Sequence, residues 1–181
     1  FEGWTDRKTI AFIPKRVTAT LQGLQGDFDG RGHTIRNITG PPLFLSTSGK
    51  IENLVLENIN IVGTGALIDE VYVRGSAIEF SNIRATGTVS GGGGGLVRQT
   101  TETTVIFSDC HFEGSLDKSG GILWRAYRGQ VTMDGCTFEG SAINQSGGIV
   151  CLLDGNTMDY INGFRTHYVR QCSSDGTFDD S

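Results

Sequence analysis

An internal repeat constrains the fold of this chain more than any other feature. Residues 105–123 and 131–150 share one order: an apolar residue, two spacers, an apolar residue, one spacer, a third apolar residue, one spacer and a glycine. After a loop, both stretches continue with Gly-Gly and an aliphatic residue. A period of this length predicts stacked coils, because one such unit is too short to bury its own apolar face.

The same frame extends towards the N-terminus, with offsets of 24, 27 and 26 residues. It places four sets in register: Leu56, Ile59, Ile61 and Gly63; Phe80, Ile83, Ala85 and Gly87; Phe107, Cys110, Phe112 and Gly114; Met133, Cys136, Phe138 and Gly140. The second landmark keeps step, beginning at Gly65, Gly94, Gly120 and Gly147. Weaker copies are Ile35, Ile38 and Gly40 before these units, and Met158, Ile161 and Gly163 after them.

The spacing inside each unit predicts the secondary structure. Apolar residues two apart indicate β-strands, and the one-residue offset indicates a corner where the chain turns. Glycine and β-branched residues interrupt every candidate helical stripe. We therefore predict a right-handed, single-stranded parallel β-helix of about four to six coils, with three strands per coil and the handedness of the general crossover rule. Like residues should form columns, about 4.8 Å apart from coil to coil.

The two ends of the chain depart from the repeat. Residues 1–27 hold strand-like stretches that are out of phase, and we predict that they cap the first coil. Residues 28–163 form the predicted β-helix, and residues 164–181 a terminal segment with a flexible acidic tail. The chain starts at Phe1 without a signal-like segment, which indicates either a removed leader or a piece of something larger.

Composition narrows the function classes. The formal charge of −5 argues against a nucleic-acid partner, which would need clustered Lys and Arg. No apolar run reaches the roughly 18 residues of a membrane-spanning helix. The 4 cysteines show no Cys/His metal spacing, so we predict neither a metal nor a cofactor.

A charged stripe is the one candidate catalytic feature. Just after the Gly-Gly landmark, two outward columns are predicted: Asp69, Arg98, Trp124 and Cys151, beside Glu70, Gln99, Arg125 and Leu152. Asp69, Arg98 and Arg125 could serve acid–base chemistry on a polysaccharide. We favour a solvated face with cross-strand ion pairs, because no second carboxylate pair reinforces the stripe. The three histidines, His33, His111 and His167, do not converge.

An aromatic and basic group is the candidate ligand contact. It comprises Tyr72, Arg74, Trp124, Tyr127 and Arg128. These side chains could form a platform on which sugar rings stack. They could equally pack against a neighbouring subunit or under the loop of residues 91–95.

Cysteines and asparagines suggest covalent modifications. Cys110 and Cys136 share a column, yet parallel stacking aims their Cβ atoms the same way, so free thiols are favoured over a disulfide. Cys151 and Cys172 could instead join the last segment to the array, with the paired and free states equally open. Asn37 and Asn144 each begin a glycosylation sequon, at the frequency expected by chance.

Two families share parts of this pattern. FDGRGHTI with IRNI and IENLVLENINIVGTGAL resembles the GLUG-type repeats of bacterial surface proteins. FSDCHFEGS with SGGIL and MDGCTFEGS with SGGIV resemble repeats of the polymorphic outer membrane protein family, although the alanine of that family's Gly-Gly-Ala element is missing. The resemblance covers roughly residues 28–163 and implies a secreted or surface-displayed adhesin or stalk.

These observations favour a non-enzymatic extracellular solenoid: a surface adhesin, stalk or filament subunit. Its partner would be a surface glycan or a protein receptor, contacted by the variable loops 63–65, 87–94, 114–120 and 140–147. One alternative is a polysaccharide-active enzyme of the lyase, hydrolase or epimerase type that uses the charged stripe. Another is an assembly module that stacks end to end through the solenoid ends.

Overall fold

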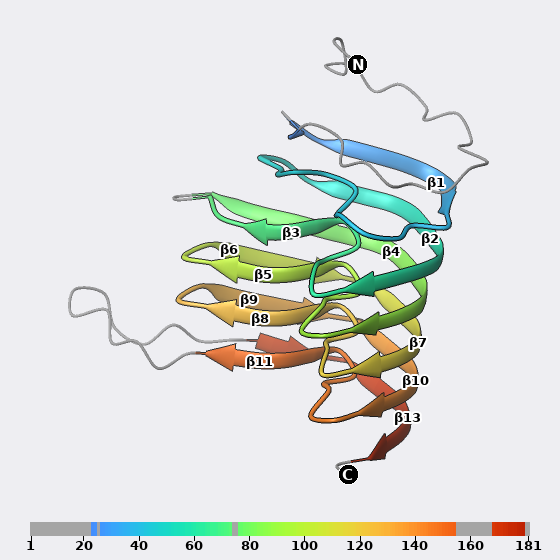
Figure 1. Ribbon diagram of the computed structural model, residues 1–181. Helices are drawn as coiled ribbons and strands as arrows, with labels where there is room; N and C mark the ends of the chain where they lie inside the picture. The colour runs from blue at the N-terminus through green and yellow to red at the C-terminus, as the bar shows by residue number, and fades with distance from the viewer. Residues whose placement is uncertain (1–22, 25, 74–75, 155–167, 180–181) are drawn as a thin grey trace.

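The chain folds as an all-β solenoid of about five turns (Figure 1). The computed structural model describes residues 23–24, 26–73, 76–154 and 168–179, and no helix occurs among them. Its strands are β1 (Phe28–Arg36), β2 (Ile51–Val62), β3 (Ile68–Val71), β4 (Ala77–Ser90), β5 (Val97–Thr101), β6 (Thr104–Ser108), β7 (His111–Asp117), β8 (Leu123–Tyr127), β9 (Gln130–Asp134), β10 (Thr137–Ile143), β11 (Val150–Asp154), β12 (Tyr168–Arg170) and β13 (Ser173–Asp179). This architecture confirms the predicted parallel β-helix.

Every strand pair is parallel, and each joins neighbouring coils. A short sheet runs in the order β11-β8-β5-β3. The larger sheet runs β12-β9-β6-β4-β7-β10-β13, with β2 paired to β4 and β1 paired to β2. One complete coil therefore consists of β5, β6 and β7, and the next of β8, β9 and β10, as the three-strand prediction requires.

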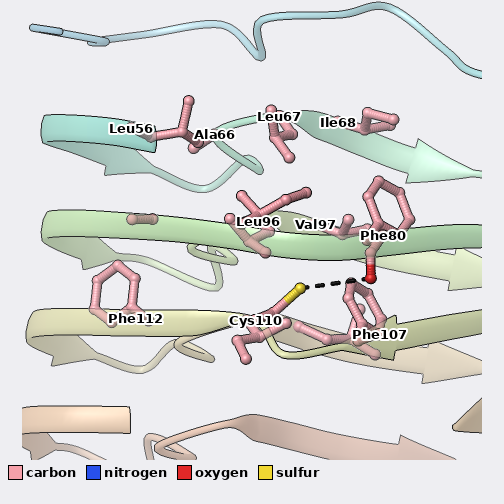
Figure 2. Packing of buried hydrophobic residues seen from close by; sticks show 14 of the residues in the cluster. Leu56, Ala66, Leu67, Ile68, Phe80, Leu96, Val97, Phe107, Cys110 and Phe112 are labelled. Carbon is pink, nitrogen blue, oxygen red and sulfur yellow. Dashed lines mark hydrogen bonds between the residues drawn. The ribbon is translucent and has the colours of Figure 1, made fainter. Parts of the chain in front are cut away.

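The core is a set of columns that run along the solenoid axis (Figure 2). Phe80 stacks on Phe107, with ring centroids 5.1 Å apart and planes 15° from parallel. In the next column Phe112 stacks on Phe138, at 6.2 Å and 5°. These four rings are almost fully buried, so identical apolar positions in the sequence do become neighbours in space.

The predicted register is wrong for one coil. The repeat frame predicts Leu56, Ile59, Ile61 and Gly63 opposite Phe80, Ile83, Ala85 and Gly87. The structure instead pairs Ile51, Leu54 and Leu56 with Phe80, Ile83 and Ala85, and it pairs Ile59 with Gly87. The spacing of three and then two residues occurs twice in IENLVLENINI, so the sequence pattern fits either choice. A register irregularity between Leu56 and Ile59 accommodates the longer coil.

The early weak copy and the second landmark have the predicted phase. Ile35 pairs with Leu56, and Thr39 forms a bridge with Asn60. The Gly-Gly landmarks bridge in sequence, from Gly65 to Gly94, Gly94 to Gly120 and Gly120 to Gly147.

The stack continues beyond the predicted boundary at residue 163. The sequence predicts that residues 164–181 lie outside the repeats, but β12 pairs with β9, and β13 pairs with β10 along its whole length. Gly176 falls opposite Gly140, so Asp-Gly-Thr at 175–177 repeats the Glu-Gly-Ser of β10. The predicted cap at 1–27, except for residues 23, 24, 26 and 27, and the weak copy at Met158, Ile161 and Gly163 lie outside the described residues.

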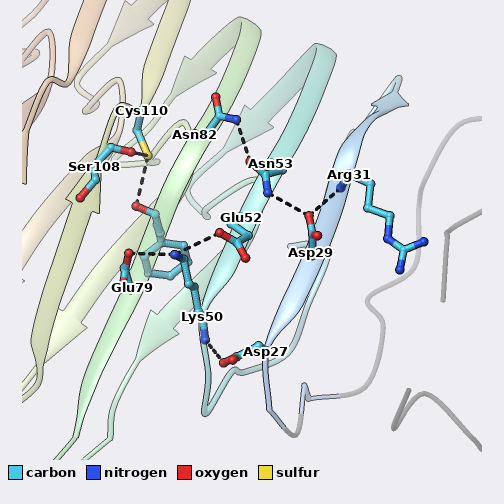
Figure 3. A network of polar contacts seen from close by, with 11 residues as sticks. Asp27, Asp29, Arg31, Lys50, Glu52, Asn53, Glu79, Asn82, Ser108 and Cys110 are labelled. Atoms are coloured by element: carbon cyan, nitrogen blue, oxygen red, sulfur yellow. Dashed lines mark hydrogen bonds and ion pairs between the residues drawn. The ribbon is translucent and has the colours of Figure 1, made fainter. Parts of the chain in front are cut away.

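One corner of the coil is set by left-handed backbone conformations. Asn53, Asn82 and Asp109 occupy this corner in successive coils, with φ of 53°, 50° and 52°. Asparagine and aspartate tolerate this region better than most residues do. The amide of Asn82 donates to Oδ1 of Asn53 over 2.7 Å, and Asn53 donates to Asp29 over 3.0 Å (Figure 3). This ladder of side-chain hydrogen bonds keeps the corners of the coils aligned.

Candidate functional site

The outer face of the short sheet carries the charged stripe predicted from sequence. Ile68, Val97 and Leu123 pair with one another and are buried, so the residue after each points outward. The register gives the two expected columns: Asp69, Arg98, Trp124 and Cys151, and beside them Glu70, Gln99, Arg125 and Leu152.

Asp69 and Arg98 form a two-pronged ion pair across neighbouring coils. Arg98 Nε donates to Oδ1 of Asp69 over 2.6 Å, and Nη2 donates to Oδ2 over 2.9 Å. The hydroxyl of Thr64 donates to the same Oδ1 over 2.9 Å. Burial alone would raise the pKa of Asp69, but the hydrogen bonds from Arg98 and Thr64 outweigh it and lower that pKa. The carboxylate raises the pKa of Arg98 in return.

The neighbouring column has its own hydrogen bonds. Oε1 of Glu70 accepts from the Thr101 hydroxyl over 2.6 Å and from the Gln99 amide over 3.3 Å. Arg125 lies two coils from Asp69, and its guanidinium is 5.2 Å from the ring centroid of Tyr127. The structure therefore brings Asp69 and Arg98 together but places Arg125 with the aromatic group.

The aromatic group divides into separate contacts. Trp124 is half-buried under the loop of residues 91–95, where a Cβ added to Gly92 would lie 3.2 Å from the indole ring. Arg128 lies 4.9 Å from the centroid of Tyr127 and 3.9 Å from Glu102.

Tyr72 has 49% of its surface exposed at the end of β3. Arg74 lies outside the described residues.

The remaining candidates are dispersed. His111 lies on the outer face of β7, with Nδ1 2.6 Å from the Thr137 hydroxyl, and His33 lies in β1. His167 is outside the described residues. Across the described ranges, no group of three or more His, Cys, Asp and Glu side chains could hold a metal ion.

Both sequon asparagines take part in side-chain hydrogen bonds. Oδ1 of Asn37 accepts from Asn58 over 2.6 Å. Nδ2 of Asn144, the atom that a glycan would modify, donates to Asp117 over 2.7 Å.

The four cysteines are free thiols and occupy two different places. Cys151 lies in the outward column of the short sheet and donates to the Gln145 carbonyl over 3.1 Å. Cys172 instead follows β12, in the coil below Cys136. The two residues proposed as partners from the sequence thus belong to different columns.

The sequence analysis did not predict a ladder of acidic side chains on the outer surface of three stacked strands. Glu113, Glu139 and Asp175 are exposed and lie opposite one another on β7, β10 and β13. The signal was present, since each precedes the glycine of an aligned Glu-Gly-Ser or Asp-Gly-Thr element.

Comparison with known proteins gives one partial match. Halomucin of Haloquadratum walsbyi is 33% identical over 102 residues, an alignment that covers 50% of this chain and 1% of halomucin. The chain thus spans only a small part of the curated protein that it matches. No family model matches, so neither of the two repeat families named above is confirmed. No solved structure matches the chain. The described residues contain no helix that is long and apolar enough to cross a membrane.

Proposed function

We propose that this chain is a non-enzymatic part of an extracellular structural or adhesive rod. The observation that carries the proposal is the continuous parallel register from β1 to β13, with one apolar core along its length. Each coil is bonded to its neighbours through backbone ladders and packs columns of like side chains on them. A stack of this kind resists bending and can present side chains at a fixed spacing.

The loops are the natural carriers of specificity. The bridges from Gly65 to Gly94, Gly120 and Gly147 place the connections before them on the same edge of every coil. Their lengths and sequences differ, while the strands on either side keep their register. A receptor or surface glycan would therefore meet a variable edge on an invariant scaffold.

The state of the charged stripe argues against catalysis. A general acid for sugar chemistry needs a carboxyl group with a raised pKa, whereas the pKa of Asp69 is lowered. Arg98 already makes two hydrogen bonds to that carboxylate. The ion pair between Asp69 and Arg98 is therefore proposed to be structural, because it joins β3 to β5.

The similarity to halomucin supports an extracellular location, because the name of that protein denotes a mucin. Labelling intact cells of the source organism with an antibody against this chain tests the location. Surface labelling is expected, and labelling only after the cells are opened would contradict the proposal.

A panel of uronic-acid and neutral polysaccharides tests the absence of catalysis. We expect neither unsaturated ends nor new reducing ends after incubation with the purified chain. Turnover that is lost in Arg98→Ala, while Gln99→Ala retains it, would overturn the proposal in favour of an enzyme.

End-to-end stacking is a second candidate. Among the described strands, β11 and β13 each pair on one side only, and Leu152 and Leu153 of β11 are 46% and 38% exposed. Such an edge can pair with another solenoid. Sedimentation velocity over a range of concentrations should then show growing assemblies that Thr177→Pro in β13 suppresses, and a strictly monomeric profile would exclude this candidate.

A further inference from the structure

Three of the four cysteines form a single column through the last coils. The amide of Thr137 donates to the carbonyl of Cys110 over 2.9 Å, and the amide of Ser173 donates to the carbonyl of Cys136 over 3.2 Å. Cys110, Cys136 and Cys172 therefore occupy the same corner of three successive coils. The repeat frame contains only the first two, because the chain from β11 to β12 is much longer than the connection from β8 to β9.

The three thiols also share one local conformation. Each Sγ donates to the carbonyl two residues earlier: Cys110 to Ser108 over 3.5 Å, Cys136 to Asp134 over 3.6 Å and Cys172 to Arg170 over 3.0 Å. Figure 3 shows the first of these bonds, and Figure 2 shows the bond from Cys110 to the Phe80 carbonyl, at 3.5 Å. The sulfur atoms thus occupy equivalent positions in successive coils, one after another along the stack.

We propose that Cys136 and Cys172 form a disulfide that fastens the last coil to the array. Cα atoms on neighbouring rungs are separated by about 4.8 Å, inside the range that a disulfide tolerates. Closing the bond requires the two Cβ atoms to turn towards each other. The coil of Cys172 can shift to allow this, because no described strand pairs with β13 on its other side.

Access selects this pair over Cys110 and Cys136. Both of those thiols are fully buried between coils, whereas Cys172 is only partly buried. An oxidant from solvent therefore meets Cys172 first. The adjacent Cys136 is then the one cysteine of the column that lies on a neighbouring coil.

The reaction is a two-electron thiol–disulfide exchange with a low-molecular-weight disulfide as oxidant. The Cys172 thiolate attacks one sulfur of the oxidant, forms a mixed disulfide and releases one small thiolate. The Cys136 thiolate then attacks the Cys172 sulfur, forms the protein disulfide and releases the second small thiolate. The two protein thiols are oxidised, their protons pass to the two released thiolates, and the oxidant is reduced to two thiols.

The thiol environments suit these two roles unequally. A hydrogen bond from Cys110 lowers the pKa of Cys136, which favours it as the attacking thiolate in the second step. Burial raises the pKa of Cys172, so the first step should limit the rate and accelerate with increasing pH.

Peptide mapping after oxidation by glutathione disulfide tests the proposal. In a Cys151→Ser background, tryptic peptide 129–165 keeps Cys136 as its one cysteine, and 171–181 contains Cys172. We expect these two peptides to be linked, with Cys110 still open to alkylation once the chain is unfolded. Linkage of 99–118 to 129–165, or three free thiols at an oxidant ratio that oxidises an ordinary surface dithiol, would overturn it.

Two variants and a hydrogen-exchange measurement test which cysteines form the bond and whether it holds the last coil in place. Cys110→Ser should leave the linkage intact, and Cys136→Ser should abolish it. In the oxidised chain, opening of the last coil, followed by hydrogen exchange in β13, should be suppressed by roughly a hundredfold. The same exchange rate before and after oxidation would show that the bond does not fasten the coil. A linkage between Cys151 and Cys172 in the unmodified chain would equally refute the assignment.

Discussion

Replacing Thr100 by valine should stabilise the solenoid. Thr100 is fully buried in β5, and its hydroxyl has no hydrogen-bond partner within the part of the chain that the structure describes. In its column Val71 lies on one side and Ala126 on the other. The hydroxyl is therefore held among apolar groups, where it has lost its hydrogen bonds to water without gaining others.

The expected gain follows from the cost of that burial. A buried hydroxyl without a partner costs about 1–3 kcal/mol, and valine has nearly the same shape with a methyl group in its place. Valine also suits the extended backbone of a buried strand. We expect Thr100→Val to raise the free energy of unfolding by about 1–3 kcal/mol.

Thr103, three residues along the same coil, provides a matched control. It is equally buried, but its hydroxyl accepts from the Val73 amide over 2.8 Å and donates to the Thr101 carbonyl over 2.8 Å. Thr103→Val leaves those two backbone groups without that partner, so it should lower the free energy of unfolding by about 1–3 kcal/mol.

Urea unfolding of the wild type and both variants, followed by circular dichroism, measures the two changes on one scale. The reasoning requires opposite shifts of the midpoint at unchanged slope. If Thr100→Val lowers the midpoint as Thr103→Val does, the Thr100 hydroxyl has a partner, such as a buried water molecule, and the account of this column fails.

Three further predictions follow from individual contacts. The pKa of Asp69 is lower in the folded chain than its usual 3.8, so the stability that its carboxylate contributes is fully present above pH 3.8 and is lost as the pH falls through the folded pKa. Urea midpoints measured against pH should show this loss, and Asp69→Asn should flatten the acidic part of the curve. Gly114→Ala should prevent folding or cost more than about 4 kcal/mol, because the φ of Gly114 is 148° and a Cβ there would overlap the Gly87 carbonyl. Gly32→Ala, where φ is 73° and the surrounding space is open, should cost only about 1–2 kcal/mol. Similar melting temperatures for the two variants would contradict the packing argument. Asn82→Ala should destabilise the chain by about 1 kcal/mol more than Asn82→Gly, because alanine disfavours φ of 50° and both variants lose the ladder bond; thermal melting of the pair measures the difference, and equal values would exclude backbone strain at this corner.

The outward columns of the candidate site could be predicted from the sequence, because their positions depend only on the spacing of residues within each coil. The columns of Asp69 with Arg98 and of Glu70 with Gln99 follow from counting onward from the Gly-Gly landmark, where the backbone repeats the same path in every coil. The spacing of the residues did not predict which of these side chains form hydrogen bonds or ring contacts with one another. The hydrogen bond from Thr64 to Asp69, and the turn of Arg125 towards Tyr127, depend on rotamers that only the folded surroundings select.

The register of the β2 coil shows where a local pattern is insufficient. Leu56 fits two frames equally well by spacing, and the choice depends on which frame buries the most side chains along every column at once. Placing Ile51 opposite Phe80 puts Ile51, Leu54 and Leu56 in the core, while Ile59 and Ile61 remain buried further along β2.

The amino-acid sequence by itself determined that this chain coils, in parallel, with a constant phase between Gly65 and Gly147, because strand spacing and glycine corners act over a few neighbouring residues. Tertiary structure alone decided that Cys172 lies below Cys136. The connection from β11 to β12 can lengthen at little entropic cost, which removes the regular offset that a sequence comparison needs. The pairing of β13 with β10 sets the register of the last coil, which the spacing of residues along the chain does not predict.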